Sequence, residues 1–196
     1  MTSPDRTSSD SRKAGLVAVV GLVGVMWVSE IVDTVLGGRL DGLGIEPRQV
    51  DGLTGVPLAP FLHGGFGHLI SNTVPFLVLG ALIALSGLAR LLVVTAVVAV
   101  VGGLGTWLVA PSGTVHIGAS GLVFGFAAYL VARGVFDRRL HYLATGLVVA
   151  FVYGTTLLLG LVPRPGVSWQ GHLFGAVGGL VAAWLLARRR RQASAR

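Results

Sequence analysis

The segment Gly118-Ala119-Ser120-Gly121-Leu122-Val123-Phe124-Gly125 opens a run of apolar residues and places a single hydroxyl group near its head. Apolar runs of about 20 residues are long enough to cross a bilayer as a helix. Gly121 and Gly125 lie four residues apart and share one helix face, along which a second helix can approach closely. Polar side chains in membrane helices usually face the bundle interior and mark function. Ser120 is therefore the first candidate functional residue.

The composition of the whole chain is that of a membrane protein. Of its 196 residues, 53% are hydrophobic and only 12% are charged, whereas soluble domains are about a quarter charged. The chain has no cysteine, which excludes disulfides, thiolate chemistry and cysteine zinc sites. Apolar runs predict six spanning helices, over residues 14–36, 66–86, 88–110, 117–134, 140–162 and 169–187.

These runs predict an all-α polytopic membrane protein with one membrane domain over residues 14–187. The Ser-rich residues 1–13 are expected to form a disordered cytoplasmic tail, and residues 188–196 a basic cytoplasmic tail. The first span follows Arg12-Lys13 and is too long for the core of a signal peptide, so it is expected to be an uncleaved signal-anchor.

Basic residues orient the predicted bundle. With six spans, both termini and the loops after the second and fourth spans share one side, which carries twelve of the 15 lysines and arginines. Cytoplasmic segments carry such an excess, so both termini are expected in the cytoplasm, in a bacterial-type plasma membrane. The run Arg188–Arg191 could bind anionic lipid or nucleic acid. A stop signal at the bilayer surface is the favoured interpretation, with no nucleic-acid partner.

Four polar residues are predicted to lie at one depth, just below the external surface. The second, fourth and sixth spans all enter from that side, and His68, Asn72, Ser120 and His172 lie near their starts. His68 and Asn72 are four residues apart, so they project from one face of their helix. Unrelated polar residues would have little reason to share a depth.

Glycine spacing predicts that the fourth and sixth spans pack together. His172, Gly175 and Gly179 share a face of the sixth span, as Gly121 and Gly125 do on the fourth. Packing these stripes would bring Ser120 and His172 within hydrogen-bonding reach, as activation of a nucleophile requires. Gly118 and Gly121 flank the serine with little bulk. Backbone N–H groups of the first helical turn, with the side chains of Asn72 and His68, could stabilise an oxyanion.

Other functions fit the sequence less well. A metalloprotease needs His-Glu-x-x-His and an aspartyl protease needs two intramembrane acids, and the chain has neither. Transport usually needs buried ionisable groups, and the six spans show no two-half repeat, so a small transporter is the weaker alternative. His63 and His116 are expected to be loop or interface residues, and His141 lies at the cytoplasmic end of the fifth span.

Three segments together resemble the rhomboid intramembrane serine proteases. They are His63-Gly64-Gly65-Phe66-Gly67-His68-Leu69-Ile70-Ser71-Asn72, the Gly118–Gly125 segment, and Gly171-His172-Leu173-Phe174-Gly175-Ala176-Val177-Gly178-Gly179. The resemblance implies a six-helix rhomboid-like bundle with Ser120 as nucleophile, His172 as general base, Asn72 and His68 in the oxyanion hole, and Gly175 and Gly179 as packing positions. It also implies transmembrane protein substrates with small residues at the cut, and no metal or cofactor. The oligomeric state is not implied.

The chain departs from that family in two places. No Trp-Arg pair lies between Ile31 and Phe61, so the anchor of the first external loop is not evident. Phe124 stands where many members have tyrosine; its ring can still stack beneath His172 but cannot donate a hydroxyl hydrogen bond. A catalytically inactive, substrate-binding relative remains an alternative.

The sequence also bears on the mechanism and on access to the site. Spans two to six contain no acidic residue except Asp137 in a cytoplasmic loop, which favours a Ser-His dyad over a triad. The segment Pro163–Ser168 is expected to act as a lid. By the resemblance, the fifth span is expected to move sideways to admit a substrate helix.

Overall fold

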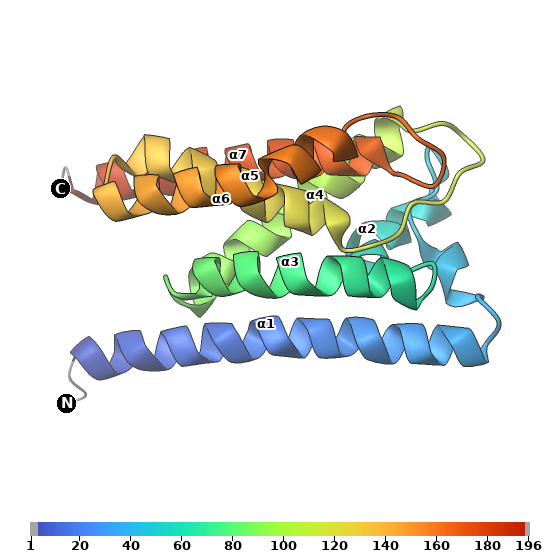
Figure 1. The fold of residues 1–196 in the computed structure, drawn as a ribbon, viewed down its shortest axis with the longest axis horizontal. Helices are drawn as coiled ribbons and strands as arrows, with labels where there is room; N and C mark the ends of the chain where they lie inside the picture. Colours follow the sequence, from blue (N-terminus) through green and yellow to red (C-terminus); the bar gives the residue numbers. More distant parts are fainter. Residues whose placement is uncertain (1–3, 195–196) are drawn as a thin grey trace.

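Six long helices form one bundle in the computed structural model, which describes residues 4–194 (Figure 1). All six are long and apolar enough to cross a membrane. They are α1 (Pro4–Val35), α3 (Phe66–Ala84), α4 (Leu88–Val109), α5 (Ser120–Asp137), α6 (Leu140–Gly160) and α7 (Trp169–Ser194). Four short helices, η1 (Leu40–Leu43), η2 (Asp51–Thr54), α2 (Gly55–Leu58) and η3 (Ala59–Phe61), connect α1 to α3.

The observed helices confirm the six predicted spans and correct their ends. Residues 4–13 were expected to be disordered, but α1 already begins at Pro4; residues 1–3 lie outside the described part. Ser11 gives this extension a tertiary role, because its hydroxyl accepts the N–H of Leu88 at the start of α4 (3.2 Å). At the other end, α7 runs on to Ser194 through most of the basic tail.

Helix α5 lies at the centre of the bundle and is the most buried of the six. Tyr129 and Phe126 on α5 are fully buried, and Phe126 packs on Phe76 of α3 with ring centroids 5.3 Å apart. On the opposite side α5 packs against α7 through glycines. A Cβ atom at Gly175 would overlap the carbonyl oxygen of Gly121, and one at Gly179 that of Gly125. The two backbones are therefore in direct contact, as small residues permit.

Helix α7 is enclosed on a second side by α4. Gly178 faces Val98, and Phe174 lies over Gly105, where even a methyl group would collide with its ring. Helix α1 packs separately along α3, where Val19 contacts Gly80 and Trp27 Nε1 donates to Thr73 Oγ1 (3.1 Å). Figure 1 shows α1 and α3 side by side at one edge of the bundle.

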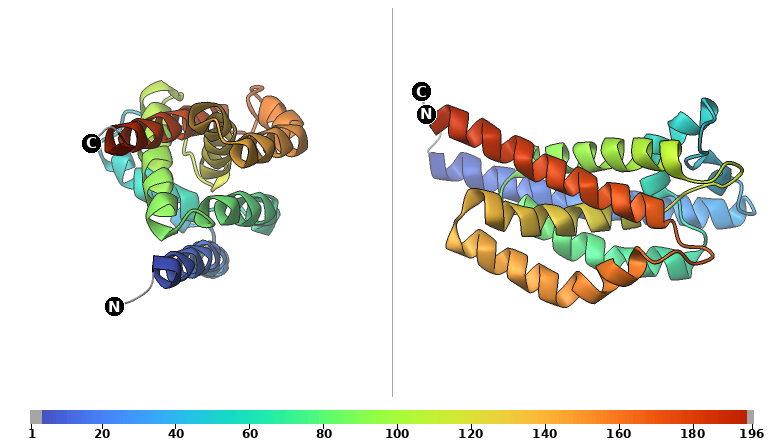
Figure 2. Two further views of the ribbon diagram at one scale, coloured as in Figure 1. Left: turned by 90° about the vertical axis from the view of Figure 1, so that its left-hand side faces the viewer. Right: turned by 90° about the horizontal axis from the view of Figure 1, so that it is seen from above.

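Helix α6 is the most exposed span. Among its described residues only Gly146, Val149 and Gly160 are buried, and its main packing partner is α5. Both termini lie at the same end of the molecule, and the short helices lie at the other (Figure 2). Arg90 near the start of α4, Arg138 and Arg139 between α5 and α6, and Arg188–Arg191 near the end of α7 lie at the end with the termini, which agrees with the charge asymmetry of the sequence.

The loop between α1 and α3, which was predicted to be external, is held by residues that the sequence did not single out. Arg48 donates to Ser112 Oγ (2.6 Å) and to the carbonyl of Leu108 (3.1 Å), while Trp107 Nε1 donates to the carbonyl of Gln49 (2.8 Å). Ile45 and His116 form an antiparallel bridge between this loop and the segment that precedes Ser120. These bonds hold the loop to the end of α4, with Arg48 in the loop and Trp107 in α4.

Candidate active site

Ser120 and His172 lie against each other where α5 and α7 begin. Ser120 is the first residue of α5, and His172 is the fourth residue of α7. Their side chains are joined by a hydrogen bond of 2.8 Å between Ser120 Oγ and His172 Nε2. The backbone contact at Gly121 and Gly175 sets this distance, because a bulkier residue at either position would separate the two helices. The structure thus brings together the two residues that the depth and glycine patterns paired.

The second ring nitrogen of His172 determines its tautomer. Nδ1 lies 2.7 Å from the carbonyl oxygen of Gly160, the last residue of α6. A carbonyl can only accept, so Nδ1 carries the hydrogen, and in the neutral ring Nε2 is left to accept from the Ser120 hydroxyl. A backbone carbonyl therefore takes the place that an aspartate holds in a triad.

Phe124 fixes the plane of the imidazole. Its ring stacks on His172 with centroids 4.1 Å apart and planes 9° from parallel. Gly160 lies directly against the Phe124 ring, because a Cβ atom at this position would overlap Phe124 Cζ. The absent tyrosine hydroxyl consequently does not prevent stacking. His172 itself is buried, with 8% of its surface exposed.

The backbone before Ser120 makes a turn that needs glycine. Gly118 has φ +111°, a conformation that L side chains rarely adopt, and the His68 ring occupies the space where a Cβ atom would lie. This turn starts α5 at Ser120, three residues later than the hydropathy pattern predicted. The N–H groups of Ser120 and Gly121 belong to the first turn of the helix, where intrahelical acceptors are missing.

His68 and Asn72 lie beside this turn, on α3. Asn72 is buried, and its Nδ2 donates to the carbonyl of His68 (3.0 Å). Within residues 4–194 the structure gives neither side chain a hydrogen bond to Ser120. His68 is thus placed next to the serine segment through Gly118, and Asn72 one helical turn further along α3.

His63 supports the same segment from the loop before α3. It is 1% exposed, and its Nε2 accepts the N–H of Ala119 (3.3 Å), the residue before the serine. Its ring meets His68 edge-on at 5.1 Å. Burial, together with the neighbouring His68, lowers the pKa of His63 to about 4. A neutral ring is what the Ala119 N–H requires, since a protonated Nε2 could not accept.

His116 joins the two loops on either side of the site. Thr114 donates its only hydroxyl hydrogen to the carbonyl of Pro111 (2.6 Å), so His116 Nε2–H donates to Thr114 (2.9 Å) and Nδ1 accepts from Ser168 (2.7 Å). Ser168 Oγ in turn accepts the N–H of Gly171 in α7 (3.3 Å). The predicted lid segment is therefore tied to the segment before Ser120. Burial lowers the pKa of His116.

In the described part of the chain, no group of three or more His, Asp or Glu side chains is arranged to hold a metal ion. The groups that lie together at the site include the Ser120 hydroxyl, the His172 imidazole and the backbone N–H groups at the start of α5.

Comparison with known proteins identifies the chain. A model of the Rhomboid domain matches residues 52–189, from η2 through most of α7. The chain belongs to the rhomboid family. The match includes Ser120, His172, His68 and Asn72, and it confirms the resemblance seen in the three sequence segments.

Relatives extend over most of the chain. This rhomboid is 48% identical to an uncharacterized protein of Mycobacterium tuberculosis over 190 residues, which cover 92% of this chain and 79% of that protein. An uncharacterized protein of Mycobacterium leprae is 44% identical, over 92% of this chain and 75% of its own. A Bacillus subtilis protein named "Putative rhomboid protease YdcA" is 30% identical over 66% of this chain and 65% of its own. The fold and the family together make this chain a multi-pass integral membrane protein.

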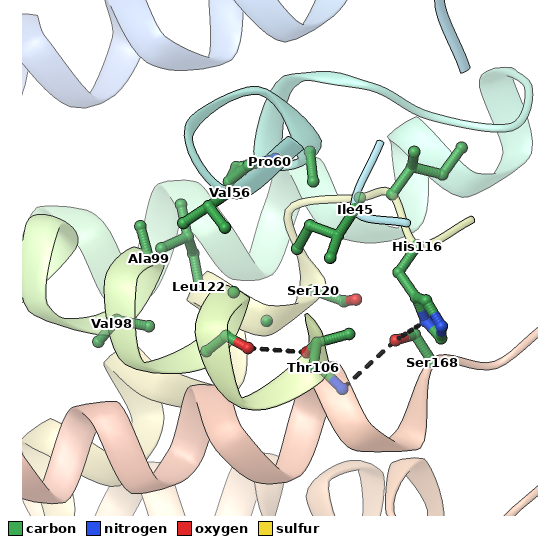
Figure 3. A pocket seen from close by; sticks show the side chains of 17 residues that line it. Ile45, Val56, Pro60, Val98, Ala99, Thr106, His116, Ser120, Leu122 and Ser168 are labelled. Atoms are coloured by element: carbon green, nitrogen blue, oxygen red, sulfur yellow. Dashed lines mark hydrogen bonds between the residues drawn. The ribbon is translucent and has the colours of Figure 1, made fainter. Parts of the chain in front are cut away.

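This rhomboid has a cavity of about 50 Å³ directly beside Ser120 (Figure 3). Its walls come from α4, from the short helices before α3, and from the segment that precedes Ser120. The lining is mostly small or apolar, with Ala99, Gly102 and Gly103 of α4, Val56 of α2 and Pro60 of η3. His116 and Ser168 lie at its polar rim. The cavity has room for a small side chain or a few water molecules.

Sequence reasoning missed three contributors to the site. His63 and His116 were expected to be loop or interface residues, and both do lie in loops, but each also bonds to the segments that carry Ser120 or His172. The sequence could have pointed to His63, because it lies only five residues before His68. It could not have pointed to the Gly160 carbonyl, because every residue has a backbone carbonyl.

Proposed function

We propose that this rhomboid is an intramembrane serine endopeptidase in which Ser120 is the nucleophile and His172 the general base. The observation that carries the proposal is the 2.8 Å hydrogen bond from Ser120 Oγ to His172 Nε2, in a ring whose Nδ1–H is held by the Gly160 carbonyl. Nucleophilic catalysis requires a hydroxyl, an adjacent base, and a group that orients the base. All three are present, and no acidic residue is needed.

The reaction would proceed in two acyl-transfer steps. Ser120 Oγ attacks the carbonyl carbon of a peptide bond while His172 Nε2 takes the hydroxyl proton. His172 then returns that proton to the leaving amine as the C–N bond breaks, which leaves an acyl ester on Ser120. Water, deprotonated by His172, attacks the ester and releases the carboxyl product with regeneration of the serine.

The negative charge of each tetrahedral intermediate requires hydrogen-bond donors. We assign these to the N–H groups at the start of α5, with His68 and Asn72 as side-chain donors. The contact of His68 with Gly118 supports this assignment. Asn72 would have to exchange its bond to the His68 carbonyl for one to the oxyanion, a change that apo sites commonly require.

The substrates proposed are transmembrane proteins in a bacterial-type plasma membrane, cut near its external face. The cavity beside Ser120 would receive the side chain that precedes the cut, and its small volume favours small residues there. Both termini of the enzyme would lie in the cytoplasm.

The test is cleavage of a panel of single-span proteins by the purified chain in detergent or liposomes. Wild type is expected to cleave at least one of them, while Ser120→Ala and His172→Ala lower the rate by about 10⁴-fold or more. Cleavage that survives Ser120→Ala would overturn the mechanism.

A fluorophosphonate probe separates the alternatives. Labelling of wild type but not of Ser120→Ala supports an activated serine, whether or not a substrate has been found. An inactive substrate-binding relative, or a small transporter, would show neither labelling nor cleavage while remaining folded.

A further inference from the structure

We infer that a basic cavity at the end of the bundle that holds both termini binds the phosphate group of an anionic phospholipid. The cavity has a volume of about 310 Å³ and lies at the opposite end of α5 from Ser120. Four arginines line it, namely Arg12 of α1, Arg90 of α4, Arg133 of α5 and Arg190 of α7, and none of the described lining residues is acidic. Four separate spans thus each place a guanidinium group around one hollow.

Within the described residues, the ion pairs do not extend to all four arginines of the cavity. Asp137 pairs with both Arg133 (3.4 Å) and Arg190 (3.3 Å). Within the described residues, neither Arg12 nor Arg90 forms an ion pair with a carboxylate. An anionic ligand is therefore expected to gain electrostatic energy there.

The cavity is also lined by hydrogen-bond donors that neighbouring side chains hold in place. Arg133 is 5% exposed and is fixed by a bond from Nη1 to Ser86 Oγ (2.8 Å) and by stacking of its guanidinium on the Tyr142 ring (3.5 Å). Arg90 is held by its bond to Tyr129 Oη (2.9 Å). The N-terminus of the 22-residue helix α4 opens at Gly87 on the same wall, and its dipole adds further positive potential.

A second cavity indicates that the phosphate comes from a lipid. A hollow of about 320 Å³ continues between α3, α5 and α6 and shares five lining residues with the first, namely Arg12, Leu85, Ser86, Arg133 and Tyr142. Leu82, Leu85 and Leu130 line this part, so apolar walls adjoin the basic ones. A phospholipid has the same order of groups, with a phosphate beside acyl chains. Basic pockets between spanning helices on the cytoplasmic side are a known type of headgroup site.

The experiment measures lipid binding to the full chain, purified in neutral detergent without phosphate, by native mass spectrometry. Dioleoyl phosphatidylglycerol is expected to bind at least tenfold more tightly than dioleoyl phosphatidylcholine. Arg12→Gln and Arg90→Gln should each weaken phosphatidylglycerol binding by about fivefold, the effect of one basic residue at an anionic surface. Arg12 is exposed and forms no ion pair with a described residue, so Arg12→Gln is expected to fold.

Arg189→Gln is the matched control, because Arg189 is exposed, lies at the same end of the molecule and does not line either cavity. It should bind phosphatidylglycerol like wild type. Equal losses in Arg12→Gln, Arg90→Gln and Arg189→Gln would overturn the site and leave only a general attraction to basic residues.

Inorganic phosphate distinguishes the source of the anion. If 10 mM phosphate stabilises the chain in a thermal-shift assay while phosphatidylglycerol is not preferred over phosphatidylcholine, the lipid assignment is wrong. The proposal does not depend on proteolysis, so Ser120→Ala should bind phosphatidylglycerol as wild type does.

Discussion

Single residues position the imidazole of His172, the proposed general base. The ring is bonded at both nitrogens and stacked on one face, by Ser120, Gly160 and Phe124 respectively. In the proposed mechanism, Gly160 and Phe124 orient the ring and do not take part in the reaction. Substitutions that move the ring should therefore impair catalysis although every reacting group is retained.

Gly160→Ala tests this at the residue that lies against the Phe124 ring. The new Cβ atom would overlap Phe124 Cζ and lie 3.1 Å from His172 Nδ1, so the ring must shift. We expect the cleavage rate to fall by about 100-fold, within the usual contribution of a general base. Gly154→Ala on the same helix meets no atom within 4 Å and is the matched control, expected to stay within about twofold of wild type. Equal activity of the two variants would contradict the positioning role of Gly160.

His63 should make stability depend on pH. The pKa of His63 in the folded protein is about 4, below the usual 6.5. Above pH 6.5 the ring is therefore neutral in both the folded and the unfolded chain, and His63 does not lower the free energy of unfolding. Between pH 6.5 and 4 only the unfolded chain takes up the proton, and the folded state loses up to about 3 kcal/mol. Unfolding midpoints in detergent should therefore drop over this range.

His63→Gln keeps an acceptor for the Ala119 N–H but cannot titrate. Its unfolding midpoint should vary less between pH 7 and 4.5 than that of wild type. His141→Gln, at an exposed histidine on α6, serves as the control and should keep the wild-type profile. A full pH dependence in His63→Gln would assign the effect to another group.

At the scale of elements, contact between glycines on α5 and α7 holds the two halves of the site together. The helices touch through backbone atoms at Gly121, Gly125, Gly175 and Gly179. Close approach of this kind gains dispersion energy along the full length of the contact and leaves no space for a methyl group. The stability of the bundle should consequently be sensitive to very small additions on this face.

Gly179→Ala should destabilise the bundle by about 1–3 kcal/mol, the usual effect of overpacking. Its Cβ atom would overlap the Gly125 carbonyl oxygen, which is part of a helix backbone and cannot move aside. Gly24→Ala on α1 meets nothing within 4 Å and should be neutral or stabilising. Thermal or denaturant unfolding in micelles measures the difference, and equal midpoints would show that the α5–α7 contact yields more readily than its geometry implies.

The elements that sequence predicts well are those with a strong hydrophobic signal. The predicted starts at 66, 88, 140 and 169 coincide with the first residues of α3, α4, α6 and α7. The predicted start at 14 comes ten residues after the first residue of α1, because the helix continues through the Ser-rich residues 4–13. The predicted start at 117 comes three residues before α5, because Gly118 has a positive φ. The pairing of Ser120 with His172 could be predicted from the spacing of the glycines on their two helices. The contacts made by loop residues and by backbone carbonyls could not be predicted, because they depend on the path of the chain between the helices.

Over the whole molecule, charge and chemistry lie at opposite ends of the bundle. The predicted external end carries Ser120, His172 and the anchored first loop, whereas the other end carries both termini and the arginine-lined cavity. Figure 2 shows the two ends separated by the length of the spanning helices. The proposed activity and the predicted orientation in the membrane therefore depend on different residues.

The absence of cysteine allows a direct test of orientation. Single cysteines at Pro165, between α6 and α7, and at Arg139, before α6, would both be exposed. In intact bacterial cells a membrane-impermeant maleimide should label Pro165→Cys and should reach Arg139→Cys only after permeabilisation. The reverse pattern would place the termini outside.

The bond between His172 and Gly160 has a mechanical consequence. The acceptor belongs to the last residue of α6, the span that is held to the bundle mainly along one side. If α6 swings outward by more than a hydrogen bond can stretch, Nδ1 loses its acceptor and the imidazole is free to turn away from Ser120. An outward position of α6 and an intact Ser120–His172 pair would then exclude each other. In the proposed protease, the pair would be separated while a substrate helix enters and would form again only after α6 has returned.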